Sequence, residues 1–230
     1  FNKNFSVLAM PYIYDNPEHQ RRVFTGDTLS ALFSSTKGNG FEVLTAYTAG
    51  ARSMYVKGAP IQTPEDMKGK KIRVMQSDTM VKMLGCMGGT GVPMGQGDVY
   101  SAIQQGVLDG AENNEITYAD LKQYEVAPHF SYTRHVMVAD LLVVNENFLE
   151  QMDAADQATF RKLAKESTAT EFDLFAQALE TAKQTATSQG ATFTEVDITP
   201  FQARCKPLQE TLLTTPEQKD IFTKIRALAN

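Results

Sequence analysis

The residues best suited to chemistry lie in one stretch of the chain, from Thr63 to Asn114. Arg73 lies in the apolar run KIRV, which is typical of a strand, and its guanidinium offers two parallel N–H donors that match a carboxylate. Asn113 lies in the polar turn expected at 109–114, after the short apolar pair Val107-Leu108. Ligands of open α/β sheets bind at the carboxyl ends of the strands. We therefore expect Arg73 and Asn113 to meet a small anion at one edge of a sheet.

The same stretch predicts a compact alternation of strands and helices. Thr63 and Pro64 are typical of a helix start, and Asp66 completes a capping-box pattern. The apolar periodicity then predicts a strand at 71–74, a helix from Ser77 to Gly88, a strand near Val92, a helix at 99–106 and a short strand at 107–108.

Outside this stretch, strands again alternate with helices, which favours a parallel α/β architecture. We expect strands at 5–10, 41–47, 131–145 and 192–196, and helices at 16–24, from 27, at 118–124 and after 216. The segment from Thr48 to Tyr55 is polar and contains glycine, so it is interpreted as a crossing between two lobes. Residues 153–189 lack proline and glycine, which predicts either one helix of roughly 50 Å or two helices separated by a kink.

The motifs of common enzymes are absent from the sequence. It contains no GxSxG elbow, no GxxxxGK[ST] loop, no HExxH and no CxxC. Asp109, Glu112 and Glu115 offer carboxylates, but acidic residues on a polar turn are usually only solvated. His19, His129 and His135 lack metal-ligand spacing. We therefore predict a binding protein rather than an enzyme, with no metal and no cofactor.

Composition and charge restrict the possible partners and the compartment. The net charge is -5 and the pI about 5.3, without a basic run, so nucleic acid is not an expected partner. No apolar stretch is long enough to span a bilayer, so membrane insertion is not expected either. Cys86 and Cys205 would be able to pair in an oxidising compartment, but buried free thiols are the commoner outcome and are expected here.

Three motifs in order, PEDMKGKKIRV, GVPM and DVYSAIQQGVLDGAEN, resemble the DctP-like solute-binding proteins of tripartite ATP-independent periplasmic (TRAP) transporters. The likeness extends to MPYIYDNPEH and to the long helix after Asp153, so it covers nearly the whole chain. It implies a periplasmic α/β protein with a two-lobed, periplasmic-binding-protein-like fold and a long helix that spans both lobes. It further implies a monomer that binds a small organic anion and meets the membrane subunits of a TRAP transporter.

The resemblance also suggests how the chain is divided. The first lobe is expected at 1–49 and 140–178, and the second at 50–139 and 179–230. Members of this family begin with βαβ units that precede the MPYIYDNPEH stretch. We therefore interpret the sequence, which starts at Phe1, as a processed or truncated piece whose first lobe lacks those units.

The resemblance assigns roles to individual residues. It implies that Arg73 holds the ligand carboxylate, that Asn113 donates to it and that Arg52 assists, with Gln76 and Asp140 lining the cleft. The residues alone leave other roles open. Arg52 reads as a surface arginine, Arg73 as one half of a salt bridge, and Asp140 as an acceptor for backbone amides.

One departure from the family pattern points to the type of ligand. Gln96 stands where dicarboxylate and sialic-acid binders carry an aromatic residue, and Asn114 replaces a proline after GAEN. Both supply amide donors and acceptors. We therefore expect a sugar acid such as a uronate or an aldonate. A C4-dicarboxylate, a ligand-sensing domain of a regulator or receptor, and an enzyme on an α/β scaffold are the alternatives.

Overall fold

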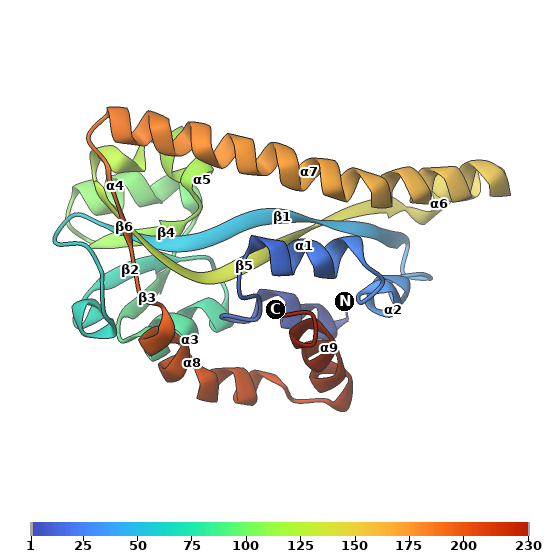
Figure 1. The fold of residues 1–230 in the computed structure, drawn as a ribbon, viewed down its shortest axis with the longest axis horizontal. Helices are drawn as coiled ribbons and strands as arrows, with labels where there is room; N and C mark the ends of the chain where they lie inside the picture. The colour runs from blue at the N-terminus through green and yellow to red at the C-terminus, as the bar shows by residue number, and fades with distance from the viewer. Residues whose placement is uncertain (1, 230) are drawn as a thin grey trace.

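The fold is organised around a six-stranded mixed sheet, as the computed structural model of residues 2–229 shows (Figure 1). The strand order is β3-β2-β4-β1-β5-β6. β2 runs parallel to β3 and β4, and β5 runs parallel to β6, whereas β1 is antiparallel to both β4 and β5. The expected parallel architecture is therefore confirmed for the strand pairs β2–β3, β2–β4 and β5–β6, but not for the two pairs that β1 forms. The strands are β1 (Phe41–Val56), β2 (Lys71–Val74), β3 (Thr90–Pro93), β4 (Gly110–Asn113), β5 (His129–Asn145) and β6 (Thr192–Glu195).

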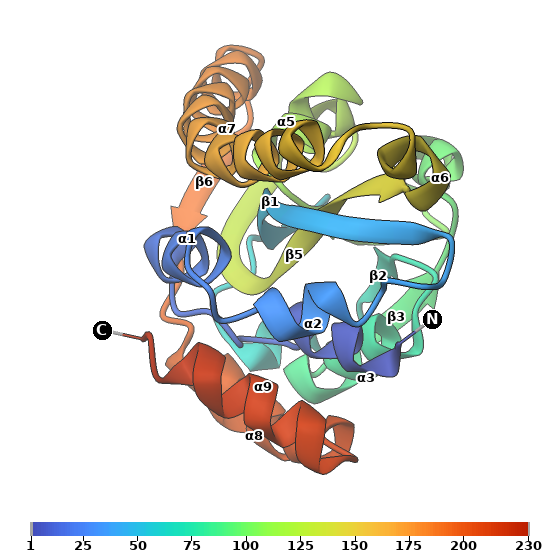
Figure 2. The same ribbon diagram turned by 90° about the vertical axis from the view of Figure 1, so that its right-hand side faces the viewer.

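The two longest strands, β1 and β5, form a ribbon through the middle of the molecule (Figures 1 and 2). The strand expected at 41–47 is longer than predicted, because residues 48–55, interpreted as a crossing between two lobes, continue β1. The pairing with β5 nevertheless shifts register between Thr48 and Ala51. Gly50 lies in this irregularity at φ +72, and a Cβ there would come within 2.8 Å of the Phe175 ring. The polar, glycine-containing sequence thus marks a bulge within a strand.

Helices cover both faces of the ribbon. α7 lies along one side of it, and α8 and α9 lie on the opposite side (Figures 1 and 2). The α-helices are α1 (Pro17–Thr25), α2 (Ser30–Ser34), α3 (Asp78–Met87), α4 (Val99–Gln104), α5 (Glu115–Asp120), α6 (Glu146–Glu150), α7 (Ala154–Ser188), α8 (Thr199–Leu212) and α9 (Pro216–Arg226). Short 3-10 helices are η1 (Lys3–Ala9), η2 (Pro64–Met67), η3 (Gln96–Asp98) and η4 (Gln123–Glu125).

The long helix is confirmed as a single element. α7 has 35 residues, and the side chain of Asp153 caps its N-terminus by accepting a hydrogen bond from the Asp156 N–H. Two hydroxyl pairs join the middle of α7 to β1. Thr45 contacts Thr168 at 2.6 Å, and the Tyr47 hydroxyl lies 2.7 Å from that of Ser167. The alternative of two helices with a kink is therefore wrong.

Three groups of buried apolar residues fill the structure. The first packs α3 and α8 against the sheet, around Met54, Ile72 and Phe201. The second joins η1, α1, α2 and α9 to the ribbon, and Phe24 lies within it. The third is largely aromatic and packs α4 and α5 onto the other face of the sheet, around Tyr118. No helix among the described residues has both the length and the hydrophobicity that crossing a bilayer requires.

Two expected strands differ from the structure, and one helix was not expected. The apolar run from Phe5 to Met10 forms the 3-10 helix η1 rather than a strand, and Asn2 caps it. The strand expected at 107–108 lies three residues later, as β4, whereas Val107 is 55% exposed. A Cβ at Gly110 would lie 2.0 Å from the Tyr55 carbonyl oxygen, so only glycine permits β4 to approach β1 this closely. Helix α8 was not predicted at all.

The two cysteines form a disulfide, which corrects the expectation of free thiols. Cys86 lies in α3 and Cys205 in α8, with their Cα atoms 5.1 Å apart and a sequence separation of 119 positions. Both helices pack on the same apolar group, and Cys205 is fully buried there. The bond therefore fixes α8 to the β2–α3 region of the fold.

Loss of this disulfide should destabilise the protein. The double variant Cys86→Ala/Cys205→Ala is expected to lose about 2–4 kcal/mol of unfolding free energy, because the unfolded chain gains entropy without the crosslink. Urea unfolding in the absence of a reductant measures the difference. Dithiothreitol should lower the stability of the wild type and leave the variant unchanged. A wild type that is indifferent to the reductant would contradict the pairing.

Candidate functional site

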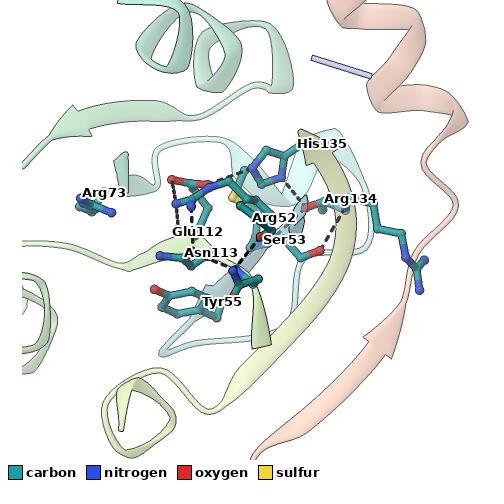
Figure 3. Close-up of polar contacts among 12 residues, drawn as sticks. Arg52, Ser53, Tyr55, Arg73, Glu112, Asn113, Arg134 and His135 are labelled. Carbon is teal, nitrogen blue, oxygen red and sulfur yellow. Dashed lines mark hydrogen bonds and ion pairs between the residues drawn. The ribbon is translucent and has the colours of Figure 1, made fainter. Parts of the chain in front are cut away.

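The centre of the candidate site is a buried ion pair between neighbouring strands. Arg52 of β1 donates from Nε to Glu112 Oε2 at 2.5 Å and from Nη2 to Oε1 at 2.8 Å, while Nη2 also reaches the Glu112 carbonyl oxygen at 2.8 Å (Figure 3). Arg52 is 6% exposed and Glu112 0%. The reading of Arg52 as a surface arginine is therefore wrong. Antiparallel pairing of β1 with β4 brings the two residues together.

His135 of β5 completes this cluster. Its Nε2 lies 3.3 Å from Glu112 Oε2, and its Nδ1 lies 2.9 Å from the Thr133 hydroxyl oxygen. That oxygen already accepts a hydrogen bond from the Met54 N–H, so its own proton is free to point at His135 Nδ1. The neutral tautomer with hydrogen on Nε2 then donates to Glu112. The cluster thus contains one cation, one anion and a neutral imidazole.

The pKa values in the cluster follow from burial and from charge. Burial alone would raise the pKa of Glu112, but the charge of Arg52 and the hydrogen bonds from His135 and Arg52 outweigh it, so the pKa is lowered. Burial also acts against the charged form of Arg52, but Glu112 keeps the pKa of this guanidinium raised. For His135 burial dominates and lowers the pKa.

Arg73 lies beside this cluster and has no acidic partner among residues 2–229. It is 4% exposed, donates from Nε to the Met94 carbonyl oxygen at 2.9 Å, and donates from Nη1 to Gln96 Oε1 at 2.8 Å. Nη2 has no hydrogen-bond partner among residues 2–229. Burial lowers the pKa of Arg73, and the attraction of Glu112 only partly opposes this effect. The salt-bridge alternative for Arg73 is not supported, since the carboxylate of Glu112 is engaged by Arg52 and His135.

Asn113 contacts Arg52 on one side and approaches Gln96, the partner of Arg73, on the other. Its Oδ1 accepts hydrogen bonds from Arg52 Nη1 at 2.8 Å and from the Asn114 N–H at 3.0 Å. Because the oxygen is engaged on that side, the Nδ2 group faces Gln96 Oε1 at 3.5 Å. Arg73 and Asn113 are at the carboxyl-terminal halves of the parallel strands β2 and β4, so their donors converge. Arg73 Nη1 and Asn113 Nδ2 both approach Gln96 Oε1, and that they meet a small anion stays a prediction.

The remaining candidates are distributed differently. Asn114 caps α5, with Oδ1 accepting from the Thr117 N–H and Nδ2 donating to the Ala49 carbonyl oxygen, so both ends of its amide have structural partners. Gln76 is exposed just beyond β2. Asp140 is exposed on β5 opposite Tyr47, and its charge contributes to the raised pKa of Arg52 without a hydrogen bond to either arginine.

The sequence did not identify the partners of Arg52. Glu112 was grouped with solvated acids, and His135 was considered only as a metal ligand. The available signal was that a central strand is buried. A carboxylate such as Glu112 in a buried strand needs a cation as its partner. Within the described part of the chain, no group of three or more histidine, cysteine, aspartate or glutamate side chains is arranged to hold a metal ion.

The family of the protein is shown by comparison with known sequences. Residues 1–214 match the family model of bacterial extracellular solute-binding proteins, family 7, named DctP. The chain therefore belongs to this family, as its motifs suggested. A solute-binding protein of Chromohalobacter salexigens is 32% identical over 96% of this chain and 66% of its own length.

Solved structures show the same fold. A TRAP periplasmic solute-binding protein of Chromohalobacter salexigens, with bound D-glucuronate, has a TM-score of 0.90 and 32% identity over 97% of this chain and 75% of that one. A TRAP periplasmic solute-binding protein of Xanthobacter autotrophicus, with bound β-D-galacturonate, has a TM-score of 0.89 and 32% identity over 98% and 75%. The chain thus spans about two thirds to three quarters of the length of these relatives. The fold is that of TRAP solute-binding proteins.

The buried cluster should make stability depend on pH. Because the folded pKa of His135 is lowered, the unfolded chain takes up a proton near pH 6.5 while the folded chain does not, so stability falls as the pH drops below about 6.5. The stability that Glu112 contributes is lost at lower pH, as the pH falls through its lowered folded pKa.

His135→Gln keeps a donor for Glu112 but does not titrate. Below about pH 6.5 the wild type should lose up to about 1.4 kcal/mol per pH unit more unfolding free energy than this variant. Urea unfolding at pH 7.5, 6.5 and 5.5 provides the comparison. Parallel pH profiles for the two proteins would show that His135 is not buried in its neutral form.

Proposed function

We propose that this protein binds a sugar acid, such as a hexuronate or an aldonate, through a carboxylate held by Arg73 and Asn113. It delivers that ligand in the periplasm to the membrane subunits of a TRAP transporter. It acts as a monomeric carrier and not as an enzyme. The observation that carries the proposal is the buried guanidinium of Arg73, which has no anionic partner among residues 2–229.

The charge balance at the site supports an anionic ligand. Arg52 and Arg73 are both buried, and Glu112 supplies the one carboxylate that pairs with either of them in the described part of the chain. A buried cation without a counter-ion is costly, and the lowered pKa of Arg73 reflects that cost. A ligand carboxylate would supply the missing charge and accept hydrogen bonds from Arg73 and Asn113 at once.

Features around the two donors favour a hydroxylated ligand. The Nε2 atom of Gln96 is buried without a hydrogen-bond partner in the described residues, and a ligand hydroxyl would provide an acceptor for it. Gln76 and Asp140 are exposed and able to reach further hydroxyl groups. The related proteins of known structure with bound glucuronate and galacturonate support the same class of ligand.

Delivery requires a conformational change, for which we propose two lobes. The first comprises 1–49 and 140–178, and the second comprises 50–139 and 179–215. Residues 179–230 were expected in the second lobe, but Ile225 of α9 packs with the apolar group around α1, so we assign α9 to the first. The register shift at Thr48–Ala51 lies at the proposed boundary. A ligand that contacts both lobes in the closed form alone would favour closure.

The disulfide supports a location outside the cytoplasm. A pairing such as Cys86 with Cys205 persists in oxidising compartments, including the bacterial periplasm. Membership of the family supports a partner in the membrane.

Removal of the Arg73 guanidinium should weaken ligand binding severely. Arg73→Ala is expected to cost on the order of 2–5 kcal/mol of binding free energy for D-glucuronate, from tens to thousands of times in affinity. Calorimetric titration measures this loss. Arg73→Lys keeps the positive charge but loses the two parallel N–H donors of the guanidinium, so an intermediate affinity is expected.

Arg21→Ala is the matched control for this experiment, because Arg21 lies on α1 and pairs with Asp173 on α7, away from the site. This variant should bind like the wild type. The proposal would have to be abandoned if Arg73→Ala bound D-glucuronate as tightly as Arg21→Ala does.

The choice of ligand provides a separate test. D-glucuronate or D-galacturonate should raise the melting temperature, and succinate should bind at least about tenfold more weakly, equivalent to about 1.4 kcal/mol. A thermal-shift titration with each acid at equal concentration measures the order. Binding of succinate without binding of any hexuronate would favour the C4-dicarboxylate alternative.

A further inference from the structure

The contacts of Gln96 suggest a second role for this residue, and the inference rests on the proposed function. Gln96 Oε1 lies 2.8 Å from Arg73 Nη1 and 3.5 Å from Asn113 Nδ2. A guanidinium only donates hydrogen bonds, so the end of the amide that faces Arg73 must be the oxygen. This oxygen therefore lies where the donors of Arg73 and Asn113 converge.

We propose that Gln96 is an internal competitor for the ligand. Its amide oxygen takes the position of one ligand carboxylate oxygen, and the ligand binds by displacing it. Nε of Arg73 already donates to the Met94 carbonyl oxygen, so a carboxylate that binds two nitrogens of this guanidinium uses Nη1 and Nη2. Gln96 is the present partner of Nη1, which carries two N–H groups. The inference requires the carboxylate to take the N–H that now donates to Gln96, so that binding exchanges one oxygen for another there.

The competitor is held at one end only. Gln96 Nε2 is buried and has no hydrogen-bond partner among residues 2–229. A buried N–H without an acceptor costs free energy comparable to what a hydrogen bond returns, so the orphaned Nε2 offsets the contact of Oε1 with Arg73. A ligand carboxylate also brings a full negative charge, which the neutral amide lacks. Displacement of Gln96 is therefore favourable for a suitable anion.

The local backbone leaves room for this movement. Gln96 begins the short helix η3 and is flanked by Gly95 and Gly97. A Cβ on Gly97 would meet no atom within 4 Å, and one on Gly95 would meet only the Asp98 carboxylate, at 3.7 Å. The buried side chain of Val99 then anchors α4 to the core. The glycines on both sides of Gln96 are thus open to space, and the inference requires its amide to turn without repacking that core.

This exchange would make Gln96 a determinant of specificity. A simple carboxylate replaces the amide oxygen at Arg73 but offers nothing to the displaced amide. A sugar acid also brings hydroxyl groups, which can pair with both Oε1 and Nε2 of the displaced side chain. Gln96 thus selects against carboxylates that lack hydroxyls and favours those that carry them.

Gln96→Met tests the inference, because methionine has a similar length and no amide. Two ligands that share a ring and a carboxylate but differ in hydroxyls are compared by calorimetry. Cyclohexanecarboxylate should bind the variant up to about tenfold more tightly than the wild type, because the competitor is gone. D-glucuronate should bind it more weakly, by a similar factor of about ten, because the hydroxyls lose their amide partner.

Gln104→Met, on the exposed face of α4, is the matched control and should change neither affinity. An unchanged or weakened affinity of Gln96→Met for cyclohexanecarboxylate would overturn the inference, while the loss of binding in Arg73→Ala would still support the proposed function. If the wild type bound neither compound, the proposed function itself would fail. Thermal unfolding establishes that each variant is folded.

A measurement on the wild type does not depend on any variant affinity. The side-chain amide signal of Gln96 is identified in a ¹⁵N-glutamine NMR spectrum by its loss in Gln96→Met. Saturation with D-glucuronate should shift this signal, because the amide leaves Arg73 and gains new partners. A signal that does not move at saturation would show that Gln96 is not displaced.

Discussion

The bidentate pairing of Arg52 with Glu112 is the interaction on which the site depends. Burial of a guanidinium and a carboxylate is costly unless their geometry is good and their remaining hydrogen-bonding groups find partners. Both conditions are met, because Asn113 and the Glu112 carbonyl oxygen accept from Arg52 while His135 faces Glu112. Since Glu112 is committed in this way, it does not neutralise Arg73 by direct contact. Arg73 therefore has no anionic partner among residues 2–229, as the proposed binding of an external anion requires.

The mixed sheet makes this division possible. The parallel strands β2 and β4 bring Arg73 and Asn113 to the same edge, where a ligand would bind. The antiparallel strand β1 then supplies Arg52 from the opposite chain direction, so its side chain reaches both Glu112 and Asn113. A wholly parallel sheet would have needed a crossover between these strands. The order of the strands therefore determines which arginine pairs with Glu112 and which does not.

Much of this arrangement was accessible from the sequence where local pattern decides the outcome. Arg73 within KIRV, the helix expected at 16–24 and the long helix α7 all followed from periodicity and capping rules. The pairing of Arg52 with Glu112 did not, because the two residues lie 60 positions apart and only the register of β1 with β4 joins them.

Other features were obscured by misleading local signals. Pro200 and Pro207 concealed α8, although Phe201 and Cys205 lie one turn apart and share its buried face. The polar residues around Thr48 suggested a loop, because their strand partners are distant in sequence. Asn114 resembled a ligand contact, but its amide caps α5. Each of these depends on contacts that no window of neighbouring residues contains.

The attachment of the C-terminal helices has a mechanical consequence. The disulfide fixes α8 to α3, whereas Ile225 of α9 packs into the apolar group around α1. The short segment 213–215 is all that joins these two anchored helices. It therefore connects the part of the fold that holds α8 to the part that holds α9, and this connection is separate from β1, β5 and α7. If the two proposed lobes part, the distance between the end of α8 and the start of α9 is limited by the reach of these three residues.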